Sequence, residues 1–113
     1  PASIQSIPTN GDNQDVVTLG TIGARKTAEL LELLNTLLAI DALMVAQAIE
    51  IRKDQHPAAT WGHAVSECLS WVRARVFRLR EDRAMAGDIE RVAMDLGKPG
   101  TLADRLLTRP HSQ

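Results

Sequence analysis

The chain has 113 residues, of which 44% are hydrophobic and 24% charged, with a formal net charge of −1. A disordered chain would have fewer apolar residues or a larger net charge, so we expect one mostly ordered domain. The small net charge argues against a nucleic-acid partner or an acidic membrane surface. The single cysteine, Cys68, excludes an internal disulfide and suits a reducing cytoplasm.

Residues 1–17 are rich in turn-forming proline, glycine, asparagine and aspartate, and we expect a loop there. The chain starts abruptly within this loop and shows no signal peptide, so we interpret it as a piece of a longer polypeptide. Asn13-Gln14-Asp15 closes the loop, and two interpretations of it are open. Asp15 or Thr18 caps the helix that follows, or the two neutral amides hold a polar ligand.

A long helix is predicted from about Thr18 to Lys53, where no proline occurs and apolar residues recur at three- and four-residue spacing. The main apolar stripe comprises Leu30, Leu33, Leu34, Leu37, Ile40, Met44, Ala48 and Ile51. A second apolar side comprises Leu31, Leu38, Val45 and Ile49. A helix that is apolar nearly all round is buried by several neighbours. At roughly 50 Å it is too long for a chain of this size to cover, which implies further chain or partner subunits.

Polar residues within this run disfavour a membrane-spanning helix. We instead expect the long helix to drive self-association into a dimer or tetramer. Leu37 and Met44 are expected to serve both assembly and folding, so that aspartate at these positions dissociates the assembly and also unfolds the chain.

A second helix, antiparallel to the first, is predicted over about residues 58–82, because His56-Pro57 ends the long helix. Its expected apolar side comprises Trp61, Val65, Leu69, Val72, Val76 and Leu79. The predicted fold class is therefore all-α.

Short helices complete the predicted fold. One fits Asp88–Leu96, with Asp88 as its cap and Gly97 at its end. A last turn or two follows Thr101 through about Leu107, which leaves residues 108–113 as a flexible tail.

The other candidate residues are expected to have structural rather than functional roles. The arginines from Arg73 to Arg83 are expected to be solvated rather than to bind nucleic acid. They either pair locally with Glu81 and Asp82 or favour a helix C-terminus. His56, His63 and His111 lack metal-ligand spacing with Cys68, so we predict no metal site. Cys68 is expected to be a small core residue.

Four phrases occur in order along residues 1–53: PAS-x-x-S-IPT, NQDVVTLG, GARKTAE and AQAIEIR. Together they resemble the histidine, phenylalanine and tyrosine ammonia-lyases and their aminomutase relatives. Histidine lyases usually carry Gln-Glu-Asp-His where this chain has Asn13-Gln14-Asp15-Val16. The chain therefore looks closest to the phenylalanine and tyrosine branch.

The resemblance implies a C-terminal portion of a cytoplasmic helical-bundle enzyme. Its active-site loop segment is residues 1–17 and its helical portion residues 18–107. Family members use an electrophilic methylidene-imidazolone group made from an internal Ala-Ser-Gly, with a tyrosine as base. They eliminate ammonia from phenylalanine or tyrosine, or shift it in a 2,3-aminomutase reaction, and they are usually homotetramers. Gln14 would lie near the prosthetic group and substrate, and Asn13 would support it.

The chain departs from a complete family member, because Ala2-Ser3 is followed by Ile4 and there is no tyrosine. We therefore expect these 113 residues alone to be inactive and to need the remainder of the lyase polypeptide. Lyase and aminomutase, and phenylalanine and tyrosine, remain open alternatives. The alternative from another class is a non-catalytic helical assembly module.

Overall fold

The computed structural model describes residues 8–9, 14–16, 19–98 and 102–107. The chain divides into two compact units, residues 1–33 and 34–113. In the first unit, β1 (Pro8–Thr9) pairs antiparallel with β2 (Gln14–Val16), with Thr9 opposite Gln14 and an irregular register at Pro8. The sequence predicted only a loop here, because two strands of two and three residues are too short to show an alternating pattern.

The long helix α1 spans Gly20–Gln55. It ends where the sequence predicts, because Pro57 has no backbone N–H and restricts the residue before it. Arg52 and Lys53 lie in the last turn, where their positive charges interact favourably with the negative end of the helix dipole.

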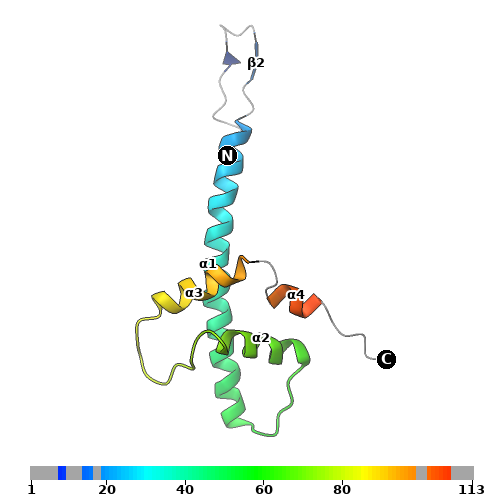
Figure 1. The fold of residues 1–113 in the computed structure, drawn as a ribbon, viewed down its shortest axis with the longest axis vertical. Coiled ribbons are helices and arrows are strands. Elements are labelled where there is room, and N and C mark those ends of the chain that lie inside the picture. The colour runs from blue at the N-terminus through cyan, green and yellow to red at the C-terminus, as the bar shows by residue number, and fades with distance from the viewer. Residues whose placement is uncertain (1–7, 10–13, 17–18, 99–101, 108–113) are drawn as a thin grey trace, which may run out of the picture. The chain divides into compact units, whose positions relative to one another are not determined.

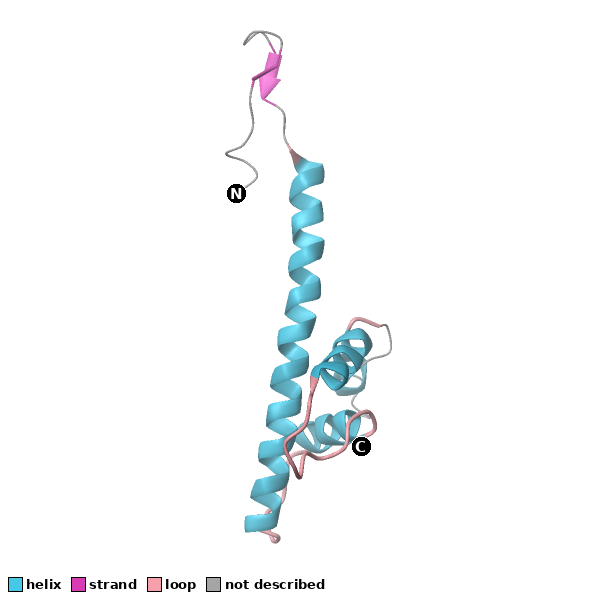
Figure 2. Cartoon of the chain, turned by 90° about the vertical axis from the view of Figure 1, so that its left-hand side faces the viewer, coloured by secondary structure: helices cyan, strands magenta, loops and turns pink. Residues whose placement is uncertain are grey.

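Three shorter helices follow α1, namely α2 (His63–Arg73), α3 (Ala86–Leu96) and α4 (Leu102–Leu107). Figures 1 and 2 show all three on one side of the second half of α1, and α2 crosses α1. The all-α class is confirmed. The second helix is nevertheless shorter at both ends than the predicted 58–82, since residues 77–80 belong to no helix.

The core lies in the second unit and joins α1, α2, the segment after α2, and α3. Its buried residues are Ala39, Leu43, Ala46, Trp71, Val72, Val76 and Val92. Val72 and Val76 were predicted on the apolar side of the second helix, and both are buried. On α1, small alanines flank Leu43 on the packed face, which lets the other helices approach closely.

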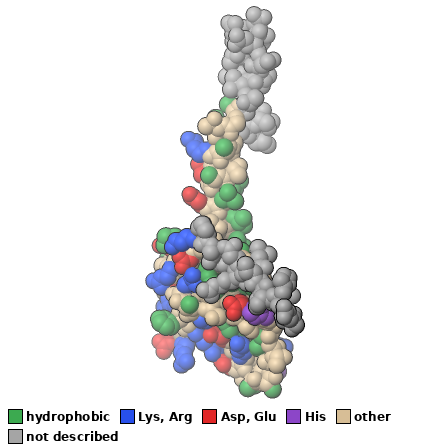
Figure 3. Space-filling view, turned by 45° about the vertical axis from the view of Figure 1, so that its right-hand side comes forward, with side chains coloured by type: hydrophobic (Ala, Val, Ile, Leu, Met, Phe, Trp, Pro, Cys, Tyr) green, Lys and Arg blue, Asp and Glu red, His purple; other side chains and the backbone are tan. Residues whose placement is uncertain are grey.

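The large apolar residues of α1 are mostly exposed in this chain. Leu37 and Met44 are 64% and 67% exposed, and Leu30 and Leu33 are 64% and 61% exposed. The prediction of a buried long helix therefore applies only to the face that carries Ala39, because three short helices cover one side of it. Figure 3 shows hydrophobic side chains at the surface among the charged ones.

Among the residues that the structure describes, no helix combines the length and the hydropathy that a bilayer-spanning segment needs.

Candidate functional site

Gln14, the first predicted site residue, begins strand β2 and lies opposite Thr9 in the hairpin. Asn13, the second, lies outside the described residues. Asp15 also belongs to β2, five positions before the first residue of α1. Asp15 therefore does not cap this helix, and Thr18 lies outside the described residues. The assignment of Gln14 and Asn13 to a substrate site remains a prediction.

The entry into α1 is marked by Leu19, which has a φ of 42°. This left-handed conformation is sterically unfavourable for leucine, because its Cβ crowds the backbone, and glycine adopts it more readily. The Leu19 carbonyl accepts a hydrogen bond from the Gly23 N–H at 3.0 Å and so begins the helical ladder.

Early in α1, Arg25 and Glu29 form an exposed ion pair at 3.8 Å. A Cβ built on Gly20 or Gly23 would meet no atom within 4 Å. Among the residues that the structure describes, therefore, nothing packs closely against either glycine.

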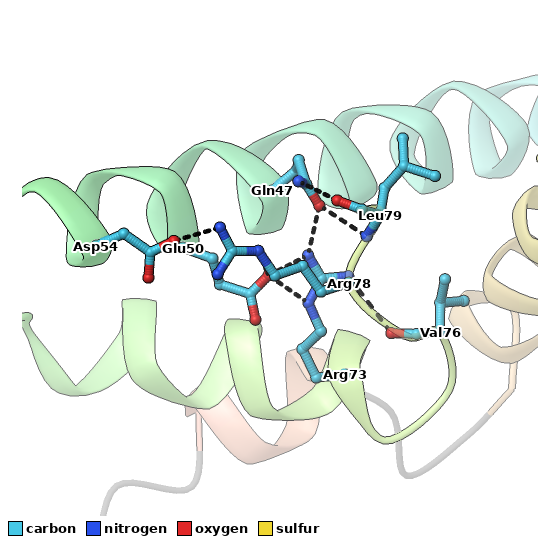
Figure 4. A network of polar contacts seen from close by, with 7 residues as sticks. All are labelled: Gln47, Glu50, Asp54, Arg73, Val76, Arg78 and Leu79. Carbon is cyan, nitrogen blue, oxygen red and sulfur yellow. Dashed lines mark hydrogen bonds and ion pairs between the residues drawn. The ribbon is translucent and has the colours of Figure 1, made fainter. Parts of the chain in front are cut away.

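A cluster of polar side chains, which we call the polar clamp, joins α1 to the end of α2 and the segment after it (Figure 4). Its members are Gln47, Glu50, Asp54, Arg73 and Arg78. Arg73 Nη2 lies 2.7 Å from Glu50 Oε2 and donates to Gln47 Oε1 at 3.3 Å. Both charged side chains are less than one-fifth exposed, at 17% and 19%, so the pair is shielded from solvent.

Gln47 also binds the backbone of Leu79 in both directions. Its Nε2 donates to the Leu79 carbonyl at 2.8 Å, and its Oε1 accepts from the Leu79 N–H at 3.1 Å. A primary amide offers the same donor and acceptor as a peptide group, so Gln47 here replaces a backbone partner. Sequence reasoning missed this role, although Gln47 was visible as a neutral polar residue within a strongly apolar run.

The outer part of the polar clamp is an ion pair, in which Arg78 Nη2 lies 2.5 Å from Asp54 Oδ2. The hydrogen bond from Arg78 lowers the pKa of the Asp54 carboxyl below its ordinary value. The same bond raises the pKa of the Arg78 guanidinium. Asp54 is 61% exposed, so this pair contributes little to stability.

Three arginines after α2, namely Arg75, Arg78 and Arg83, pair with acidic residues of α1 or α3. None of these pairs involves Glu81 or Asp82, the local partners that the sequence suggested. Arg75 Nε donates to Asp95 Oδ2 at 2.7 Å, and its guanidinium lies 3.8 Å from the centre of the Trp71 ring. Arg83 pairs with Asp88. Asp88 was predicted to cap α3, but the helix begins two residues earlier at Ala86, and no side chain caps it. These pairs neutralise the basic run, which disfavours a nucleic-acid site.

An apolar pocket of about 430 Å³ lies beside the polar clamp. Its lining residues are Ile40, Leu43, Met44, Gln47, Ala48, Ile51, Arg73, Phe77, Leu79, Met85 and Ile89. Phe77 is 88% exposed, so one wall of the pocket is formed by an aromatic ring in solvent. A pocket with so few polar groups can hold apolar side chains but has little means of orienting a polar substrate.

Cys68 is half-buried and lines a second pocket of about 250 Å³, to which α1, α2, α3 and α4 all contribute residues. Burial raises the pKa of its thiol, and the neighbouring Glu67 raises it further. A thiol of this kind is a weak nucleophile. Cys68 was predicted as a small core residue, but it is only half-buried and does not belong to the buried core. In the described part of the chain no three metal-binding side chains gather, and His111 lies outside it.

A sequence profile of the aromatic amino acid lyases matches residues 1–74. Over 93 residues the chain is 45% identical to a tyrosine ammonia-lyase of Cupriavidus metallidurans, covering 82% of this chain and 17% of that enzyme. It is 44% identical over 98 residues to an MIO-dependent tyrosine 2,3-aminomutase of Streptomyces globisporus, covering 87% of this chain and 18% of that enzyme. It is also 40% identical to a histidine ammonia-lyase of Natranaerobius thermophilus, covering 81% of this chain and 17% of that enzyme.

The crystal structure of the tyrosine aminomutase from Streptomyces globisporus superposes with a TM-score of 0.74 at 44% identity, over 85% of this chain and 18% of that one. The chain thus spans less than a fifth of the length of these relatives. Its order of helices is that of the corresponding part of a solved aminomutase. Profile, relatives and structure agree, and the chain belongs to the aromatic amino acid lyase family.

Proposed function

We propose that this chain forms the C-terminal portion of an ammonia-lyase or 2,3-aminomutase that acts on phenylalanine or tyrosine. The observation that carries the proposal is the 44–45% identity to two tyrosine enzymes, and the family match over residues 1–74 includes Asn13-Gln14-Asp15. An uncharged amide at position 14 suits an aromatic ring, whereas an imidazole that can be protonated favours a carboxylate. The proposed compartment is the reducing cytoplasm, which the single cysteine favours.

The proposed prosthetic group of the complete enzyme is methylidene-imidazolone, which supplies an electrophile that proteins lack. The residues of this chain do not fit its formation, since Ala2-Ser3 is followed by Ile4 and no tyrosine is present. The proposed contribution of the chain is therefore the two amides, Gln14 and Asn13, and the long helix.

A second candidate function is that of a non-catalytic helical assembly module, which the exposed apolar side chains on α1 favour. The two candidates differ in what the complete protein contains. An enzyme carries an Ala-Ser-Gly segment upstream of Pro1 and the ultraviolet absorbance of the prosthetic group, and an assembly module carries neither.

The first prediction tests the substrate site in the complete protein, with the 113-residue chain as an inactive reference. Gln14→Ala is expected to lower kcat/KM for phenylalanine or tyrosine by roughly ten- to a hundred-fold, because an unsatisfied buried partner costs about 1–3 kcal/mol. The measurement follows cinnamate or coumarate by absorbance, with rearranged β-amino acid resolved by chromatography.

The matched control for this test is Gln55→Ala, which removes the same amide from an exposed position at the end of α1. It is expected to retain the parent kinetics. If Gln14→Ala and Gln55→Ala behave alike, Gln14 does not belong to the site. Product formation by the 113-residue chain itself would show that its own residues suffice for the chemistry.

A further inference from the structure

The local sequence does not explain why α2 ends at Arg73. No proline or glycine occurs between Gly62 and Gly87, and Val72, Val76 and Leu79 keep a helical spacing. Helical hydrogen bonding even continues past the end of α2, since the Val76 N–H donates to the Val72 carbonyl at 3.0 Å. The chain then leaves the helix, and residues 77–80 have no regular structure.

One helical hydrogen bond shows how the continuation is prevented. In a longer helix, the Leu79 N–H would donate to the Arg75 carbonyl, four residues earlier. Instead, the Leu79 N–H donates to Gln47 Oε1 at 3.1 Å, and the Arg75 carbonyl accepts from Arg91 Nη1 at 3.0 Å. Both partners of this bond are therefore occupied by side chains of other helices, Gln47 from α1 and Arg91 from α3.

A neighbouring helical bond is blocked in the same way. The Val76 carbonyl, which would accept from the Arg80 N–H, lies 3.4 Å from Arg73 Nη1. Arg73 is held in turn by Glu50 at 2.9 Å through its Nε and by Gln47 (Figure 4). Buried backbone groups must find partners, so side chains that supply these partners stabilise the non-helical path.

We propose that residues 77–82 are a latent continuation of α2, and that Gln47 is the positioning residue that keeps them out of the helix. The polar clamp satisfies the backbone of Leu79 in the non-helical state, and the helical state would satisfy it internally. Phe77 and Leu79 line the apolar pocket together with Gln47, so the clamp also sets the shape of that pocket. The segment is a two-state element whose balance depends on one amide side chain.

The proposal is tested on the whole chain with Gln47→Met, which keeps the length of the side chain and removes its hydrogen bonds. We expect ellipticity at 222 nm to increase by the equivalent of roughly one to two helical turns. The Cα chemical shifts of residues 77–82 should move toward helical values. Gln55→Met, at an exposed position of the same helix, is the matched control and should change neither quantity.

A second substitution separates a latent helix from a merely released loop. Proline at position 80 is incompatible with a helix through this segment, but in the parent structure residue 80 lies outside any helix. Arg80→Pro alone should therefore leave the ellipticity unchanged, and Gln47→Met/Arg80→Pro should lose the gain seen with Gln47→Met.

Unchanged ellipticity and chemical shifts in Gln47→Met would overturn the proposal. A shift of residues 77–82 toward random-coil values, without a helical gain, would overturn it as well. If Gln47→Met does not melt cooperatively, the thermal melt of Gln47→Met/Arg80→Pro tests the proposal. Removal of the competing helix should restore a cooperative melt, and an equally broad melt would contradict the inference.

Discussion

At the scale of single residues, charged side chains join helices to one another in this chain. Arg75 donates to Asp95 and to the Trp71 carbonyl at 2.8 Å, while its guanidinium lies over the Trp71 ring. Lys98 donates to the same Asp95 carboxylate at 2.7 Å. Asp95 is thus shared between two cations, and its protonation state bears on how α2 and α3 are held together.

The second prediction concerns the pH dependence of this contact. The hydrogen bond from Lys98, followed by that from Arg75, lowers the pKa of Asp95 below its ordinary value. The unfolded chain therefore takes up a proton at this carboxyl at higher pH than the folded chain does. The resulting stabilisation is fully present above about pH 4, the ordinary aspartate pKa, and is lost as pH falls through the folded pKa.

Urea unfolding at a series of pH values between about 2 and 6 measures this effect. Asp95→Asn should weaken the acid dependence of the free energy of unfolding, because asparagine cannot take up the proton. An acid dependence equal to that of the parent chain would show that Asp95 is not responsible.

At the scale of elements, the packing of α1 against α2 and α3 depends on small buried residues. Ala39 and Val92 are fully buried, and Ala46 and Val72 nearly so. Larger side chains in place of Ala39 or Ala46 would hold the helices apart, because interiors are close-packed. The stability of the second unit should therefore respond to changes of one or two methyl groups.

The third prediction is that Val92→Ala destabilises the chain by about 1–3 kcal/mol, through lost burial and an unfilled cavity. Chemical denaturation with a constant m-value measures the change. Val65→Ala on α2 makes the same deletion at a position that is 36% exposed, and it should cost clearly less. Equal losses in the two variants would mean that the packing around Val92 is not as described.

At the scale of the whole molecule, the apolar residues of α1 are more numerous than this chain can cover. Leu37, Leu38, Met44 and Val45 are between 47% and 67% exposed, and all lie on the α1 part of the second unit. An apolar surface of this kind favours association with other chains. We therefore propose that the chain self-associates through α1.

The fourth prediction is that light scattering finds a species heavier than the 12.3 kDa chain, and that Leu37→Asp/Met44→Asp reduces it to a monomer. Both residues lie outside the buried core, so the variant should keep its helical ellipticity. This replaces the expectation from sequence that the double substitution also unfolds the chain. Gln55→Glu, which adds a charge at an exposed position, should leave the assembly intact. A monomeric parent chain would contradict the prediction.

The sequence by itself determined the family, the all-α class and the places where proline and glycine end helices. The four phrases along residues 1–53 are specific enough to indicate the family, and the apolar periodicity located α1. These features depend on residues that are close together in the sequence, so they can be recognised without the tertiary structure. Gln14 and Asn13 were proposed from the same local pattern, and their role stays a prediction.

Only the tertiary structure decided which face of α1 is buried and where α2 ends. With apolar residues nearly all round α1, periodicity favours no single face, and the packed face proved to be the one with Ala39, Leu43 and Ala46. The end of α2 depends on Gln47, 32 residues earlier in the chain than Leu79. Contacts between residues so far apart have no local signature, because the hydrogen-bond partner becomes available only after the helices have packed.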